Sequence, residues 1–174
     1  MSNIQEVLPA SEFLKKNLGI SEIPTEAYLN YGYALLAIAG ADGVVSESEL
    51  NWLVNHQRLA DAPEEVIEKY KTFEYKNADL EPLLAKVSVD VSTWSKSRSL
   101  LYHAIQMARA DEDYSIEELK AVKKAAKLLK VEDDIALALN RLVETEEAVT
   151  ALRKALLQTE VLAEFSRTPK SLAV

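Results

Sequence analysis

An internal repeat limits the folds open to this chain more than any other feature of the sequence. Residues 33–50 align without gaps on residues 102–119, and seven of the 18 aligned positions are identical. The identical pairs are Tyr33/Tyr102, Ala39/Ala108, Ala41/Ala110, Asp42/Asp111, Ser46/Ser115, Glu49/Glu118 and Leu50/Leu119. Two copies are too few for a solenoid. They predict instead a pair of helix–loop–helix hairpins that pack face to face around a pseudo-twofold axis.

Helix is the expected conformation for most of the chain. Only 4 glycines and 5 prolines interrupt the 174 residues, and the alternating pattern typical of strands is scarce. Residues 87–91 have a strand-like composition, but they are interpreted as a connector because no pairing partner is evident. Helices are predicted near residues 11–19, 28–39, 47–59, 63–70, 80–86, 95–110 (opening at Ser92 or Ser95), 116–130 and 132–158, the last with a break at Thr145 or without one.

The length of the chain fits one domain, because two domains would each be small. We therefore expect residues 1–174 to form a single all-α domain, a compact bundle of about seven to nine helices. The first repeat spans about residues 28–68 and the second about residues 97–139, with residues 1–23 and 145–174 as flanking helices and tail.

Composition excludes several classes of function. The chain has no cysteine, which excludes disulfides, thiolate zinc sites and cysteine nucleophiles, and its two histidines argue against a multi-histidine metal centre. A net charge of −8 argues against binding to nucleic acid or to anionic membranes, and it permits a cationic partner. Carboxylates are the remaining abundant metal ligands.

The location of the protein is also constrained by the apolar segments. The longest uncharged run, residues 27–41, is shorter than the roughly 20 residues that a membrane-spanning helix needs. Residues 1–19 carry early acidic residues and no sustained apolar stretch, unlike a secretory signal. We expect a cytoplasmic protein that is not itself transmembrane.

Helix capping explains part of the repeated pattern. Ser46 and Glu49, like Ser115 and Glu118, have the spacing of a capping box, in which the serine and glutamate side chains satisfy backbone amides of the first turn. The aspartate that precedes each box then serves as a turn residue. This explanation requires no ligand.

Two further observations favour a metal site. Both copies carry an aspartate seven residues before the glutamate, which capping does not require. Both glutamates also fall on the apolar, packing side of their helices, away from the lysines of residues 120–127. Two carboxylates about 5 Å apart repel by about 0.8 kcal/mol in water and about 3 kcal/mol at an effective dielectric constant of 20. A cation would remove this repulsion.

The first loop also matches the second half of a calcium-binding EF-hand loop through Asp42, Gly43 and Glu49. The acids required earlier in such a loop are missing in both copies. A self-contained EF-hand site is therefore not expected in either loop. Half a site from each repeat would make one shared site or two adjacent ones.

The sequence resembles the TerB family of tellurite-resistance proteins and its TerB-like relatives. The resemblance rests on residues 41–49 and 110–118, each after an alanine-rich helix, and on residues 119–129 followed by the Val-Glu-Asp-Asp segment 131–134. It covers roughly residues 28–139. It implies an all-helical fold of two repeats whose acidic loops form a negatively charged surface proposed to bind divalent metal.

Carried over residue by residue, the resemblance implicates Asp42, Glu49, Asp111 and Glu118 as metal ligands. Glu112 departs from the family's usual glycine in the second loop. Oxygen ligands favour Ca²⁺ first, and Mg²⁺ or Mn²⁺ after it. His56 lies two helical turns after Glu49 and is interpreted either as a packing residue, the commoner role, or as a further ligand for Zn²⁺.

The leading hypothesis is thus a non-enzymatic, divalent-metal-binding protein linked to tellurite or related metal stress. The alternative is a metal-independent module whose acidic surface docks a basic protein, since TerB-like units occur in chaperone-associated and membrane-associated contexts. A hydrolase with a two-metal site is the weakest hypothesis, because no nucleophile, histidine cluster or phosphate-binding glycine loop is recognisable. His103 is expected to be structural, and Trp52 and Trp94 are expected to lie in the core.

Overall fold

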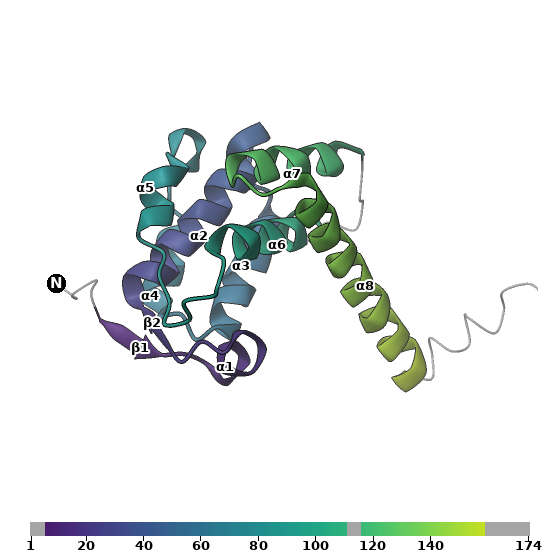
Figure 1. The fold of residues 1–174 in the computed structure, drawn as a ribbon, viewed down its shortest axis with the longest axis horizontal. Helices are drawn as coiled ribbons and strands as arrows, with labels where there is room; N and C mark the ends of the chain where they lie inside the picture. The colour runs from purple at the N-terminus through teal and green to yellow at the C-terminus, as the bar shows by residue number, and fades with distance from the viewer. Residues whose placement is uncertain (1–5, 111–115, 159–174) are drawn as a thin grey trace, which may run out of the picture.

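A computed structural model describes residues 6–110 and 116–158, apart from the side chains of Asp42, residues 116–119 and Ala121. Within this part, eight α-helices dominate and confirm the all-α class (Figure 1). In chain order the elements are β1 (Val7–Pro9), α1 (Glu12–Leu18), β2 (Glu22–Pro24), α2 (Thr25–Ala39), η1 (Gly40–Asp42), α3 (Glu47–Leu59), α4 (Glu64–Tyr70), η2 (Tyr75–Asn77), α5 (Leu80–Ala85), α6 (Lys96–Ala108), α7 (Ile116–Leu128) and α8 (Asp133–Leu157).

Helix α2 forms the centre of the molecule. Its sequence is apolar on nearly every side, as expected for a helix that is surrounded by others, and Ala34, Leu35 and Leu36 are fully buried. It packs against helices α3 to α7. Helix α2, the first helix of the first repeat, therefore forms the core against which helices of both repeats pack.

Local capping residues explain where several helices begin and end. Ser11 caps α1, which ends at Gly19 in the left-handed conformation at φ 69°. Ser95, rather than Ser92, caps α6. Residues 87–91 contain no strand and connect α5 to α6, as predicted.

A short antiparallel sheet was not predicted. Strands β1 and β2 have three residues each and pair with Leu8 opposite Ile23. Strands this short, each ending in a proline, carry no detectable alternation. The sheet places the carbonyl of Glu6 2.8 Å from the backbone N–H of Thr25, the first residue of α2.

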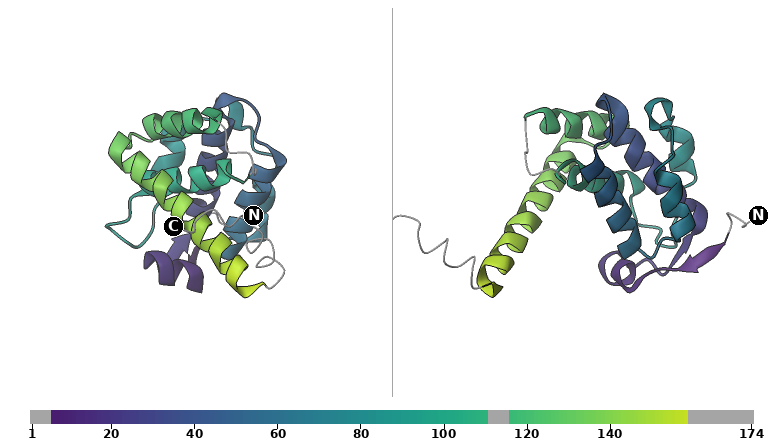
Figure 2. Two further views of the ribbon diagram at one scale, coloured as in Figure 1. Left: turned by 90° about the vertical axis from the view of Figure 1, so that its right-hand side faces the viewer. Right: turned by 180° about the vertical axis from the view of Figure 1, so that it is seen from behind.

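Helix α8 is continuous, so the suggested break at Thr145 is wrong. The Thr145 hydroxyl donates to the carbonyl of Arg141 at 2.8 Å, which satisfies it within the helix. The first half of α8 packs on α6 and α7, and the second half projects from the body of the molecule (Figure 2). Apolar side chains are exposed along this helix, with Leu142, Val149 and Leu156 46%, 48% and 62% exposed.

The prediction that the chain is not itself transmembrane agrees with these elements. Within residues 6–110 and 116–158, no helix combines the length and the apolar character needed to cross a bilayer.

Candidate functional site

The first acidic loop packs against an aromatic side chain. Gly40 lies so close to the ring of Tyr75, in η2, that a Cβ atom at this position would overlap it. The Tyr75 hydroxyl accepts a hydrogen bond from the backbone N–H of Val45 at 3.2 Å. Tyr75 therefore fixes both the start of the loop and the approach to α3.

Glu49 forms the predicted capping box. Its Oε2 accepts from the backbone N–H of Ser46 at 2.7 Å, and Ser46 Oγ accepts from the N–H of Glu49 at 3.2 Å. Capping thus accounts for the serine and the glutamate of the first copy without a ligand. One carboxylate oxygen of Glu49 stays outside this pair of bonds.

The half-buried side chain of Glu49 faces the second repeat. It lines a cavity of about 50 Å³ together with Leu101 and Ala104 of α6 and Val122 and Ala125 of α7. This placement agrees with the expectation that the repeated glutamate lies on the packing side of its helix. On α7, Val122 and Ala125 are buried, whereas the four lysines Lys120, Lys123, Lys124 and Lys127 are exposed.

The other three predicted ligands cannot be placed in the same way. Asp42 ends η1, but its side chain lies outside the described part of the chain, as do Asp111 and the side chain of Glu118. One positively charged side chain of the described residues reaches the first loop, because Lys124 Nζ donates a hydrogen bond to the carbonyl of Ala41 at 2.9 Å. Helix α7 therefore touches the first loop directly.

A metal ion needs more oxygen donors than the described residues of the acidic loops supply. Ca²⁺ takes about six to eight oxygen ligands, and Glu49 is the one predicted ligand whose side chain is described. No three histidine, aspartate or glutamate side chains within the described ranges lie close enough together to hold an ion. Glu49 fits the role of a single oxygen donor, and the described residues alone do not complete a coordination shell.

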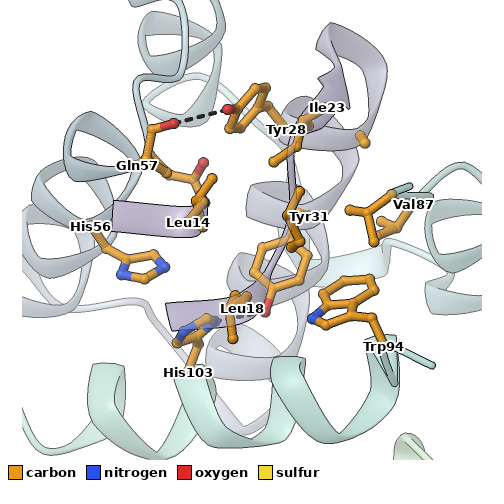
Figure 3. A pocket seen from close by; sticks show the side chains of 14 residues that line it. Leu14, Leu18, Ile23, Tyr28, Tyr31, His56, Gln57, Val87, Trp94 and His103 are labelled. Atoms are coloured by element: carbon orange, nitrogen blue, oxygen red, sulfur yellow. Dashed lines mark hydrogen bonds between the residues drawn. The ribbon is translucent and has the colours of Figure 1, made fainter. Parts of the chain in front are cut away.

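The two histidines form a cluster between the repeats that sequence reasoning missed (Figure 3). The ring centroids of His56, on α3, and His103, on α6, are 4.2 Å apart. His56 stacks on Trp52 at 4.9 Å with an interplanar angle of 7°. The Tyr31 hydroxyl lies 2.6 Å from His103 Nδ1. No sequence signal indicated this contact, because the two histidines occupy non-equivalent positions of the repeat.

Burial keeps both imidazoles neutral. It lowers the pKa of His56 to about 4. It also lowers the pKa of His103 well below its ordinary value, and the proximity of His56 adds to this effect. The structural role expected for His103 agrees with its burial and its bond to Tyr31, while Trp52 and Trp94 are only partly buried at the edge of the core.

Known proteins share both this sequence pattern and this fold. The family model described as tellurite resistance protein TerB matches residues 33–141, which include the aligned residues 33–50 and 102–119. The chain belongs to the TerB family. A crystal structure of a tellurite resistance protein from Nostoc punctiforme is 31% identical, covers 91% of this chain and 97% of its own, and superposes with a TM-score of 0.76. The curated proteins contain no match to this chain.

Membership of this family confirms the resemblance read from the two loops and places the protein among those of the tellurite-resistance type. The matched range includes residues 56 and 103.

Proposed function

We propose that this TerB-family chain is a non-enzymatic protein that binds a divalent metal ion, Ca²⁺ before Mg²⁺, Mn²⁺ or Zn²⁺, between its two repeats. The ligands in this proposal are Asp42, Glu49, Asp111 and Glu118. Glu49 carries the argument, because its carboxylate faces α6 and α7 of the second repeat and keeps one oxygen free of the capping box.

Charge supports the same proposal. The chain has a net charge of −8, and a half-buried carboxylate is stabilised by a nearby cation. Lys124 already brings one positive charge to the first loop. A divalent ion would compensate the remaining acids more completely than one ammonium group does.

Isothermal titration of the full chain with Ca²⁺, Mg²⁺, Mn²⁺ and Zn²⁺, beside thermal unfolding with and without chelator, tests the proposal. An ion at 100 times its dissociation constant should stabilise the fold by about 2.7 kcal/mol. The decisive variant is Glu49→Gln, because glutamine preserves the capping box and removes only the charge. We expect Ca²⁺ affinity to fall at least about tenfold, which corresponds to about 1.4 kcal/mol.

Glu47→Gln is the matched control. Glu47 precedes Glu49 by two residues on the same first turn and is exposed, so it carries the same formal charge without facing the second repeat. Equal loss of affinity in both variants would indicate a diffuse electrostatic effect. The absence of heat and of any thermal shift with all four ions would reject metal binding.

Metal-independent docking is the second candidate, and the observation in its favour is the capping box. Because Ser46 and Glu49 stabilise the helix start without an ion, the acidic loops are free to meet a basic partner. An oligolysine peptide titrated at low and physiological salt would bind more weakly at higher salt, as expected for screened charges. Binding of the peptide without binding of any ion would favour this candidate.

A further inference from the structure

Two adjoining hollows meet at the histidine cluster, outside the acidic loops. An inner cavity of about 50 Å³ lies between α1, α2, α3 and the segment before α6, and an outer groove of about 710 Å³ lies between α1, α3, α6 and α8. Leu14, Leu18, His56 and His103 line both. The two histidines therefore lie where the two hollows adjoin, and Figure 3 shows them in the lining of the inner cavity.

The lining of the inner cavity is electrically neutral. Its side chains are aliphatic, aromatic or amide groups, and the described wall contains no aspartate, glutamate, lysine or arginine. Burial lowers the pKa of His56 to about 4 and that of His103 further, so both rings are uncharged at neutral pH. A charged ligand, including a metal dication, would lose its hydration here without gaining a counter-charge.

Polar groups without partners lie in this wall. Gln57 is 3% exposed, and its Oε1 has no hydrogen-bond partner within the described chain. The indole N–H of Trp94 is likewise buried and unpaired there. One is an acceptor and the other a donor, so a group that both donates and accepts, such as a hydroxyl or an amide, complements them.

The outer groove is lined by an arginine of α6, a glutamate of α8 and several polar residues, beside large apolar side chains that supply a surface for an apolar body. Phe13, Leu59 and Leu142 line it and are 41%, 61% and 46% exposed. Trp52 and His56 add a stacked aromatic pair to its floor. Its volume lies within the range of about 300–1,000 Å³ that is usual for small-molecule sites.

We infer that the two hollows form one binding site for a neutral amphiphile, a small molecule with a hydroxyl or amide head and an aliphatic or aromatic body. The head occupies the inner cavity beside Gln57, Trp94 and the neutral histidines. The body lies in the groove between α1, α3 and α8. This site uses none of the acidic residues proposed to bind metal, so each proposal stands or falls alone.

Three probes that share one tail and differ only in the charge of the head test this inference: 1-octanol, octanoate and octylammonium. Trp94 lines the inner cavity and Trp52 the groove, so tryptophan fluorescence reports occupancy of the site. We expect saturable binding of 1-octanol at least about tenfold tighter than that of either ion. Equal affinities for the three probes, or no saturable binding, would overturn the inference and leave a cavity that holds water only.

Val89→Phe is the blocking variant, because Val89 is a half-buried loop residue that lines the inner cavity. Val91→Phe is its matched control, since Val91 is a half-buried residue of the same loop outside that lining. The first should weaken 1-octanol binding at least about tenfold and the second should leave it unchanged. Equal effects would contradict the proposed position of the head.

A second variant keeps the test valid if Val89→Phe fails to fold. Gln57→Leu removes the buried acceptor at nearly constant volume, and it should weaken 1-octanol binding while the fold is retained by circular dichroism. Unchanged affinity in the folded Gln57→Leu variant would contradict the role of this acceptor.

Discussion

The two helical hairpins carry the same loop pattern but are held by different parts of the molecule. In the first, Gly40 leaves room for the ring of Tyr75, whose hydroxyl bonds to Val45. In the second, the equivalent position is Arg109, whose Nη2 lies 2.6 Å from Glu147 Oε2 of α8 and whose Nη1 lies 3.8 Å from Glu144. An aromatic ring supports one loop, and ion pairs support the entry to the other.

This difference shows how a duplicated motif diverges. In the first copy, the shared Ser46 and Glu49 form the capping box at the helix start, whereas positions 40 and 109 differ and each contacts the neighbour that its own copy meets. The hairpins still meet at several contacts, among them that of His56 of the first with His103 of the second. The predictions below perturb the histidine contact first and the separate supports afterwards.

Acidification should give the largest effect. The pKa of His56 is about 4 in the folded protein against 6.5 for the ordinary group, so the unfolded chain binds more protons between these values. Stability is therefore fully present above about pH 6.5 and falls by up to about 3 kcal/mol as the pH drops toward 4. His103 adds to the loss in the same direction.

Urea unfolding at pH 7 and pH 4.5 measures this loss. The His56→Phe variant separates it from carboxylate titration, because phenylalanine preserves stacking on Trp52 and cannot be protonated. If the pH dependence were as steep in His56→Phe as in the parent chain, protonation of His56 would not be the cause of the lost stability.

Gly40→Val should give the next largest loss of stability. The added side chain overlaps the Tyr75 ring, and overpacking of this kind costs about 1–3 kcal/mol. The midpoint of urea unfolding reports it. In a Tyr75→Ala background the same substitution should cost much less, since the obstacle is gone; an unchanged cost would mean that Tyr75 is not the neighbour that requires glycine.

Arg109→Ala should cost about 1–2 kcal/mol. Each ion pair contributes up to about 1 kcal/mol because the glutamates are half exposed, and the buried stem of the arginine adds packing. Arg109→Met keeps the stem and removes the charge. Unlike the cost of Gly40→Val, the cost of Arg109→Met should shrink in high salt; salt-independent costs at both positions would remove the distinction between the two supports.

Ser46→Ala should cost about 1 kcal/mol, the usual value for loss of an N-cap. The repeat predicts the same cost for Ser115→Ala at the equivalent position. Chemical unfolding of both variants compares the two helix starts directly. A negligible effect at Ser115 would show that the second copy has lost the capping role that the first retains.

Sequence reasoning succeeded where the controlling interactions are local. Ser11, Gly19 and Ser46 mark helix ends because their bonds reach only three or four residues along the chain. The family was also readable from the two loops. Such signals depend on short spacings that the sequence displays directly.

The remaining features depend on contacts between distant segments. The β1–β2 pair is too short to show alternation, and the continuity of α8 at Thr145 reflects a side chain that bonds within the helix as well as it would cap. For the acidic site, the capping box and the inward face of Glu49 were predictable from spacing. The meeting of His56 and His103 was not, because it depends on how α3 crosses α6.

The long final helix has consequences for local unfolding. At about 1.5 Å per residue, its 25 residues extend about 37 Å, and Glu144, Glu146 and Glu147, near its middle, bind it to α6 and to the C-cap residue of α6. After these anchors, Leu152 and Leu157 are 58% and 77% exposed. Amide protons there should exchange with solvent through partial opening, at a lower free energy than amides in α2. One chain thus contains two levels of protection against exchange, and a single melting temperature would record only the higher one.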